Sequence, residues 1–265
     1  MNRFSITSLP GFTPIALLCF VLLYLPILTI VAFSFNGAKS MNDWGGFSLH
    51  WYRVAWANEA VKEVTLRSLV VAFWATLIAT VAATLAALAT TRGKAFRGRG
   101  VIGGMVNQTL VVPEIVTAIS LLIFFAPIKV ASEYQGLGYL IMAHAIWVLP
   151  LAYLPIRARL EGMDLSMESA AADLYATRWQ TLRHVTLPLC APAILAGAML
   201  CFVTSLDTVV ITEFVKSGGQ DTLATFMLSQ LRRQITPEIN AISTALLGFT
   251  LILLTLSFLL TRKRD

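Results

Sequence analysis

The sequence predicts an all-α integral membrane protein with six transmembrane helices. Its composition is the first indication, because 57% of the 265 residues are hydrophobic and only 13% are charged. A soluble domain carries about a quarter charged residues. The second indication is a series of six apolar runs, each near the roughly 20 residues that a helical span requires. The spans are expected at residues 12–35, 65–90, 101–126, 137–156, 189–215 and 241–260.

The first run, at 12–35, follows a short polar lead and has a competing interpretation as a cleaved signal peptide. It is longer than the apolar region of a signal peptide and lacks a small-x-small cleavage site, so a retained span is favoured. Pro14 and Pro26 lie inside it. Membrane helices tolerate proline where neighbouring groups satisfy the freed carbonyls.

The next spans differ in the residues that they contain. The second is rich in Ala and Thr on successive turns, as close packing of helices in lipid requires. The third contains Pro113 and Glu114 near its middle, and the fifth carries Asp207 in its outer half. The fourth contains His144 and Trp147.

The distribution of Lys and Arg predicts the orientation. Twelve of the 20 basic residues fall in one set of segments, namely the N-terminus, 91–100, 157–188 and the C-terminal tail. The positive-inside rule assigns this set to the cytoplasm, with both termini inside. The segment at 36–63 then lies outside, where its tryptophans suit the headgroup level of the bilayer or a surface for a soluble partner.

The longest helix-like polar break, 161–188, is predicted to form a cytoplasmic coupling loop. Its stretch from Glu168 to Ala176 is rich in Ala and prone to form a helix. Small side chains there allow a partner's surface to approach closely, and Leu187-Pro188 is expected to end the helix and begin the next span. A solvated connector is the alternative interpretation.

This segment resembles the EAA loop of ABC importer permeases. Ser169-Ala170-Ala171 stands at Glu-Ala-Ala, Tyr175 at the family's Gly, and Val185-Thr186-Leu187-Pro188 at its closing Ile-x-Leu-Pro, with every spacing kept. The resemblance runs nearly end to end and is strongest to the PotC-like permeases of spermidine/putrescine-type importers. It is carried elsewhere by Asn36-Gly37, Trp51-Tyr52, Pro113-Glu114-Ile115-Val116, Ser205-Leu206-Asp207 and Pro237-Glu238-Ile239-Asn240-Ala241.

Two positions depart from the family pattern. The Glu of the motif is Ser169, although Glu168 lies next to it, and the Gly is Tyr175. A Gly there allows a turn with positive φ, which an aromatic residue disfavours. Either the turn is reshaped or the partner's groove differs.

The resemblance implies a fold and a set of partners. The fold is that of a type I (MetI-like) ABC importer permease, a single domain over residues 1–265 with a cytoplasmic coupling helix, in a bacterial inner membrane. The partners are a second homologous permease, a cytoplasmic ATPase dimer and an extracytoplasmic solute-binding protein. ATP and Mg²⁺ are bound by the ATPase, so this chain has no cofactor and is not an enzyme. Contact with the ATPase is implied for Glu168, Ser169, Ala170, Ala171, Asp173, Leu174, Tyr175, Ala176, Val185, Leu187 and Pro188.

A second constellation consists of polar residues inside the spans, where an ionisable group marks a substrate path or a packing partner. Carboxylates with an aromatic ring for cation–π contact suit a multiply charged amine. The pathway candidates are Asp207, Glu114, Ser205, Trp147, His144 and Glu213.

Each candidate also has a structural interpretation. Glu114 follows Pro113 and can satisfy freed backbone donors, while His144 suits a hydrogen-bonded packing residue. Asp207 is the strongest pathway candidate, and a bond to a neighbouring helix is its main rival.

The sequence excludes several classes and leaves others open. It has no phosphate-binding Gly-rich loop ending in Gly-Lys-Ser/Thr and no HExxH or GxSxG pattern. A net charge of +6 without a basic, aromatic-rich patch does not indicate nucleic acid. The main hypothesis, which the resemblance implies, is an importer of polyamines. An importer of an opine, an amino acid or another small polar solute, an ion-coupled secondary transporter and a membrane scaffold remain alternatives.

Overall fold

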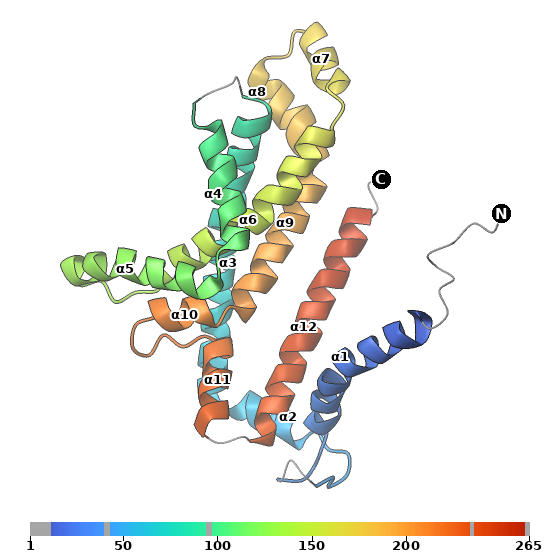
Figure 1. The fold of residues 1–265 in the computed structure, drawn as a ribbon, viewed down its shortest axis with the longest axis vertical. Helices are drawn as coiled ribbons and strands as arrows, with labels where there is room; N and C mark the ends of the chain where they lie inside the picture. Colours follow the sequence, from blue (N-terminus) through green and yellow to red (C-terminus); the bar gives the residue numbers. More distant parts are fainter. Residues whose placement is uncertain (1–11, 40–42, 94–96, 234–235, 263–265) are drawn as a thin grey trace, which may run out of the picture. The chain divides into compact units, whose positions relative to one another are not determined.

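The computed structural model describes residues 12–39, 43–93, 97–233 and 236–262. Within these ranges the chain forms helices joined by turns and loops, and its only β pairing is one isolated bridge between Asn36 and Phe47 (Figure 1). Six helices are long and apolar enough to cross a membrane. The predicted all-α membrane class is confirmed. The two termini, whose cytoplasmic location was predicted, lie outside the described residues.

The helices follow one another with short connections. They are α1 (Phe12–Ser34), α2 (His50–Ala57), α3 (Glu59–Thr91), α4 (Arg99–Val111), α5 (Glu114–Ser132), α6 (Gly138–Gly162), α7 (Ser166–Asp173), α8 (Arg178–Thr181), the π-helical turn η2 (Leu182–Thr186), α9 (Leu187–Asp207), α10 (Val210–Val215), α11 (Leu223–Arg233) and α12 (Pro237–Arg262).

The chain divides into two compact units, one of residues 1–59 and 229–249, the other of residues 60–228 and 250–265. The core of the second unit lies where α6 packs on α9. A methyl group at Gly197 would come within 2.9 Å of the Cα of Ala152, so a side chain there would push the two backbones apart. Small residues at such a crossing let membrane helices approach closely.

The structure places two helices where one third span was expected at 101–126. Pro113 lies between α4 and α5 with φ −54° and ψ 137°, an extended conformation. Proline has no N–H for the helix ladder and its ring displaces the preceding turn. Consequently α5 turns sharply away from α4 (Figure 1), and Glu114 begins a new helix.

The junction before the fifth span also differs from expectation. Leu187-Pro188 does not end the helix, because α8, η2 and α9 continue one another from Arg178 to Asp207. A proline ring inside an α-helix clashes with the carbonyl four residues earlier. The wider π turn immediately before Pro188 relieves that clash, so the span rises directly from the coupling loop.

In the first unit, Asn36 organises the loop after α1. Its Oδ1 accepts from the backbone N–H groups of Ala38 (3.1 Å) and Gly45 (2.7 Å), and its Nδ2 donates to the Asp43 carbonyl (2.7 Å). A Cβ at Gly45 would lie 2.7 Å from the backbone nitrogen of Ala38, so this approach requires glycine. Trp44 and Trp56 remain exposed, as expected of side chains at a membrane interface.

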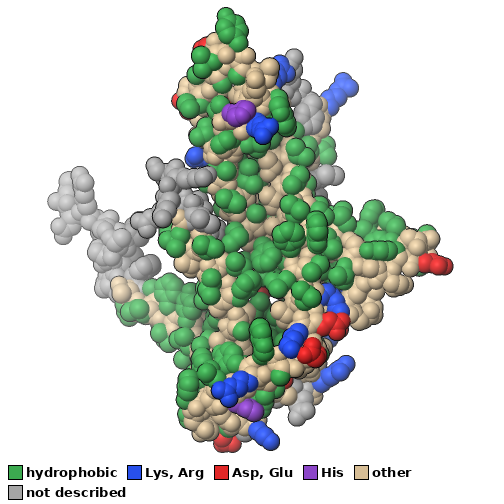
Figure 2. Space-filling model, turned by 180° about the vertical axis from the view of Figure 1, so that it is seen from behind, with side chains coloured by type: hydrophobic (Ala, Val, Ile, Leu, Met, Phe, Trp, Pro, Cys, Tyr) green, Lys and Arg blue, Asp and Glu red, His purple; other side chains and the backbone are tan. Residues whose placement is uncertain are grey.

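Apolar side chains dominate the surface of the molecule. They are spread over the face in Figure 2, whereas the charged side chains gather in a few clusters. In α1, the apolar residues from Ile15 to Ile30 are largely exposed. Such a surface is stable only against lipid or another apolar protein surface.

Candidate functional site: the coupling loop and the α10 network

The coupling loop, residues 161–188, begins with a capped helix. The carboxylate of Asp164 accepts from the backbone N–H of Ser166 (2.9 Å) and from its hydroxyl (2.6 Å). These two hydrogen bonds lower the pKa of Asp164. The first turn of α7 is therefore held by a charged acceptor at the positive end of the helix.

The end of α7 keeps the turn that a glycine normally makes. Tyr175 has φ +59°, in the left-handed region. The Tyr175 N–H donates to the Ala172 carbonyl (2.9 Å) and the Ala176 N–H to the Ala171 carbonyl (3.0 Å). This pair of bonds is a Schellman motif. The departure from the family pattern thus leaves the turn unchanged, at a backbone cost of about 1–2 kcal/mol for a residue with a Cβ.

The second helix of the loop, α8, begins with a capping box. Thr177 and Gln180 form a reciprocal capping box, in which the Gln180 N–H donates to Thr177 Oγ1 (3.3 Å) and the Thr177 N–H to Gln180 Oε1 (2.7 Å). Because η2 follows without a break, α8 is a rigid extension of α9. Motion of the loop therefore reaches the fifth span directly.

The loop presents an apolar edge to the surroundings of the chain. Tyr175 is 95% exposed, Leu174 83% and Trp179 67%. Ser169, Ala170, Asp173 and Pro188 are exposed, and Ala171, Ala176, Val185 and Leu187 are half-buried. Large apolar side chains held at a capped turn indicate a surface for a partner.

Glu168 is the exception among the implied contact residues, because its carboxylate points into the protein. Its Oε1 accepts from Arg92 Nε (2.8 Å) and from the hydroxyl of Thr186 (3.1 Å). Only 20% of each side chain of the Arg92–Glu168 ion pair is exposed. Glu168 therefore joins α7 to the end of α3 and to η2.

Asp207 is the last residue of α9 and is exposed. Within the described part of the chain, no hydrogen bond or ion pair satisfies its carboxylate. A negative charge at the carboxyl end of a helix is unfavourable. Fold stability therefore does not explain this residue.

Glu114 lies in the first turn of α5, against the backbone N–H of Ile211 at the start of α10. At the other end of α5, Lys129 Nζ donates to the Val215 carbonyl at the end of α10 and to Ser217 Oγ (3.3 Å). Helix α10 thus receives an acid at its amino end and a base at its carboxyl end. This arrangement supports the structural interpretation of Glu114.

His144 lies buried between three helices. Its Nδ1 pairs with Ser205 Oγ of α9 at 2.8 Å, and its Nε2 pairs with Thr212 Oγ1 of α10 at 2.9 Å. Trp147, one turn along α6, packs half-buried between the two apolar clusters of this unit. His144 and Ser205 satisfy each other, which favours a packing role in this conformation.

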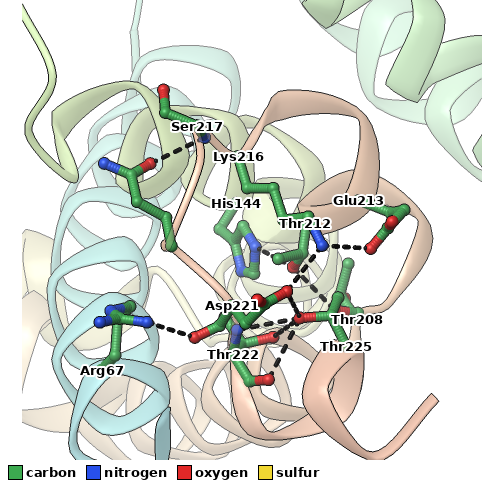
Figure 3. Close-up of polar contacts among 11 residues, drawn as sticks. Arg67, His144, Thr208, Thr212, Glu213, Lys216, Ser217, Asp221, Thr222 and Thr225 are labelled. Atoms are coloured by element: carbon green, nitrogen blue, oxygen red, sulfur yellow. Dashed lines mark hydrogen bonds and ion pairs between the residues drawn. The ribbon is translucent and has the colours of Figure 1, made fainter. Parts of the chain in front are cut away.

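Glu213 belongs to a set of polar contacts around the end of α10 (Figure 3). Lys216 Nζ contacts Glu213 Oε2 at 2.6 Å and Asp221 Oδ1 at 2.7 Å. Arg67 Nη1 donates to the Asp221 carbonyl at 2.9 Å. We call Glu63, Arg67, Glu213, Lys216, Asp221 and Thr225 the α10 network.

The charge of Lys216 is maintained by the α10 network. Burial lowers its pKa, but the bonds to Asp221 and Glu213 outweigh burial, so the pKa is raised. Its stabilisation is fully present below the unfolded pKa of about 10.4 and is lost only as the pH rises through the folded value. Half-exposed pairs of this kind contribute about 0–1 kcal/mol each.

Sequence reasoning missed three residues that the structure makes important. Arg92 was counted only as a basic residue, and Lys129 was not singled out as a partner of α10. Thr212 was not considered, although its spacing of four from Thr208 on one helical face was a usable signal. Arg92 gave no signal, because its partner lies 76 positions away.

Comparisons with known proteins show that the chain is similar to membrane components of transport systems. A family described as "Binding-protein-dependent transport system inner membrane component" matches residues 79–263. The spermidine/putrescine transport system permease protein PotC of Haemophilus influenzae is 36% identical over 243 residues, which cover 92% of this chain and 93% of that protein. The putrescine transport system permease protein PotI of Escherichia coli K12 is 35% identical over 251 residues, 94% of this chain and 89% of that protein.

Solved structures show the same fold at low identity. A bacterial ABC transporter that imports alginate has a TM-score of 0.71 at 14% identity, over 95% of this chain and 93% of that one. The MetNI methionine ABC transporter has a TM-score of 0.63 at 15% identity, over 78% of this chain and 98% of that one. The expected MetI-like fold is confirmed. Because the family model matches residues 79–263, which is most of its length, the chain belongs to the family of binding-protein-dependent transport system inner membrane components.

Proposed function

We propose that this chain is one of two permease subunits of an ATP-driven importer for polyamines such as spermidine and putrescine. The names of the relatives support the substrate class. Family membership supports the division of labour, in which a second homologous permease completes the pathway and an external protein delivers the solute.

The exposed edge of the coupling loop carries the proposal. Leu174, Tyr175 and Trp179 stand out from a frame capped at Asp164 and Thr177. A pair of cytoplasmic ATPase subunits binds this edge, and closure of the pair on ATP moves α7. ATP and Mg²⁺ are held by the ATPase, so this chain has no cofactor and no catalytic role.

The proposed orientation in the inner membrane is supported by where the basic segments and the α10 network lie. The Arg92–Glu168 ion pair brings the basic segments 91–100 and 157–188 together. The α10 network gathers residues of α3, α10 and the segment before α11 elsewhere in the same unit. With the positive-inside rule, the coupling loop and both termini are cytoplasmic, and the α10 network faces the external binding protein.

Asp207 is the residue that best suits contact with the substrate. Its carboxylate has no partner in the described part of the chain, so a cationic amine gains an ion pair there without breaking one. Glu114, His144 and Ser205 have partners, and Glu213 is paired with Lys216. They shape the region around the path in this conformation.

Reconstitution tests the proposal. The purified assembly in proteoliposomes, given loaded binding protein and ATP, should hydrolyse ATP faster with putrescine or spermidine than with an opine or an amino acid. If only an amino acid stimulated ATP hydrolysis, the proposed substrate would be wrong, but the proposed importer function would stand. Uptake by this chain without the ATPase would contradict the importer and support a secondary transporter.

A further inference from the structure

The coupling loop is connected to the membrane helices by two routes of different kinds. The first is covalent, because η2 runs without a break into α9. The second is the carboxylate of Glu168, bonded to Arg92 Nε and to Thr186 Oγ1. Among the described residues of α7, Glu168 is the only one whose side chain is bonded to a residue outside the coupling loop.

Arg92 is placed to transmit movement to α3. Its N–H donates to the Leu88 carbonyl (2.8 Å), which continues the winding of α3 past Thr91. Its guanidinium lies inside the protein, where Nη2 has no partner among the described atoms. A largely buried guanidinium held by one carboxylate is costly to separate from it, because the charge would be left unpaired.

We propose that Arg92 is a positioning residue for coupling, which acts through Glu168 to make α3 move with α7. The inference rests on the proposed function, since it assumes that the ATPase acts on the loop. In this account α9 follows α7 through the chain, and α3 follows it through the ion pair. Without the ion pair, the ATPase still binds the loop and still moves α9, but α3 no longer moves with α7.

Thr186 reinforces this assignment. It is the last residue of η2, it is buried, and its hydroxyl donates to the same Glu168 oxygen that Arg92 contacts. One oxygen therefore joins α7, α3 and η2. The three elements move together only while Glu168 is charged and in place.

The test is a double-mutant cycle on the reconstituted assembly, with uptake and ATP hydrolysis measured in parallel. Arg92→Met keeps the apolar stem, and Glu168→Gln keeps the shape of the carboxylate. Each should lower uptake per ATP hydrolysed about 5–100-fold, the range of typical coupling free energies. In Arg92→Met, which lies outside the coupling loop, basal ATP hydrolysis and co-purification of the ATPase should be unchanged. The double variant should be no worse than the worse single variant, because both remove the same bond.

The matched control is the Arg157–Glu161 pair on α6, which joins residues of one helix at 2.8 Å. Arg157→Met with Glu161→Gln should leave uptake per ATP unchanged. If Arg92→Met does not assemble, Thr186→Val, which removes only one bond to Glu168, should give a smaller loss in the same direction.

Two outcomes separate the inference from the proposed function. A wild-type assembly without ATP-driven uptake would contradict the proposed function itself. Normal uptake per ATP in Arg92→Met, or additive losses in the double variant, would overturn the inference alone.

Discussion

The coupling loop and the α10 network use polar residues in opposite ways. The loop holds its own frame with hydrogen bonds at Asp164 and Thr177, is joined to Arg92 through Glu168, and leaves apolar side chains exposed. The network pairs its charges with one another and holds α10 between its neighbours. The first arrangement suits a surface that another protein covers, and the second suits a part that the chain stabilises by itself.

Asp207 lies next to the α10 network and does not follow its pattern. Thr208, the following residue, is bonded to its own helix, and Glu213 is paired with Lys216. Asp207 has no such contact among the described residues. In this respect Asp207 resembles the exposed edge of the loop, since both lack a partner among the described residues.

The largest effect is expected from a substitution on the exposed surface of the coupling loop. Ala170 is exposed on α7, so Ala170→Arg leaves the helix intact and places a bulky charge where a partner approaches. ATP-driven uptake should fall about 100-fold or more, as expected when an unpaired charge is buried in an interface at a cost of about 3–5 kcal/mol. The measurement is uptake by proteoliposomes.

Ala158→Arg provides the control, because Ala158 is also exposed and lies on α6 outside the loop. Normal uptake in an assembled Ala170→Arg importer would show that the exposed edge is not the partner surface.

The next effect tests the unpaired carboxylate. Asp207→Asn removes a charge that no described residue needs, so assembly should be unchanged. The concentration of polyamine for half-maximal uptake should rise about tenfold, as a lost ion pair of about 1.4 kcal/mol implies. Glu213→Gln, which alters a paired carboxylate, should change it less than Asp207→Asn does. Equal effects of the two variants would remove the distinction between them.

The third effect concerns stability. His144→Ala leaves Ser205 and Thr212 without their buried partner and opens a cavity. The free energy of unfolding should fall by about 2–4 kcal/mol, which thermal unfolding in detergent can follow. His50→Ala, at an exposed histidine, should have no measurable effect. A stable His144→Ala protein that loses uptake would instead place His144 on the pathway.

The smallest effect separates the backbone and the side chain of Tyr175. Tyr175→Gly keeps the left-handed turn and removes the exposed ring, so the amide of Ala176 should exchange no faster. Tyr175→Val places a β-branched residue at positive φ, and the end of α7 should fray by about 1 kcal/mol. Hydrogen exchange at Ala176 measures both. Faster exchange in the glycine variant would mean that the ring supports the turn.

Much of the fold was accessible from the sequence, because apolar length and Lys and Arg placement act locally. The six apolar helices were predicted from such patterns, and the family was predicted from the resemblance of the coupling loop to the EAA loop. The break at Pro113 was visible as a proline, but whether a membrane helix bends or divides there depends on its neighbours. The same holds for Pro188, where the structure inserts a π turn.

The candidate site also combines local features with contacts between distant positions. The exposure of Leu174 and Tyr175 agrees with the partner contact that the resemblance implied, whereas the left-handed turn kept at Tyr175 was not predicted. The pairing of Glu168 with Arg92 and of His144 with Thr212 joins distant positions. A single sequence carries no periodic signal for such pairs.

Cross-linking tests the central claim most directly, namely that the ATPase binds the exposed edge of α7. A cysteine introduced as Ala170→Cys should form an adduct with the ATPase subunit in the intact assembly, and Ala158→Cys should not. The native Cys190 and Cys201 are buried and should stay unreactive, and the exposed Cys19 of α1 is replaced by Ser in both variants. An assembly that imports its solute with ATP yet gives no adduct at position 170, while position 158 reacts, would contradict the account.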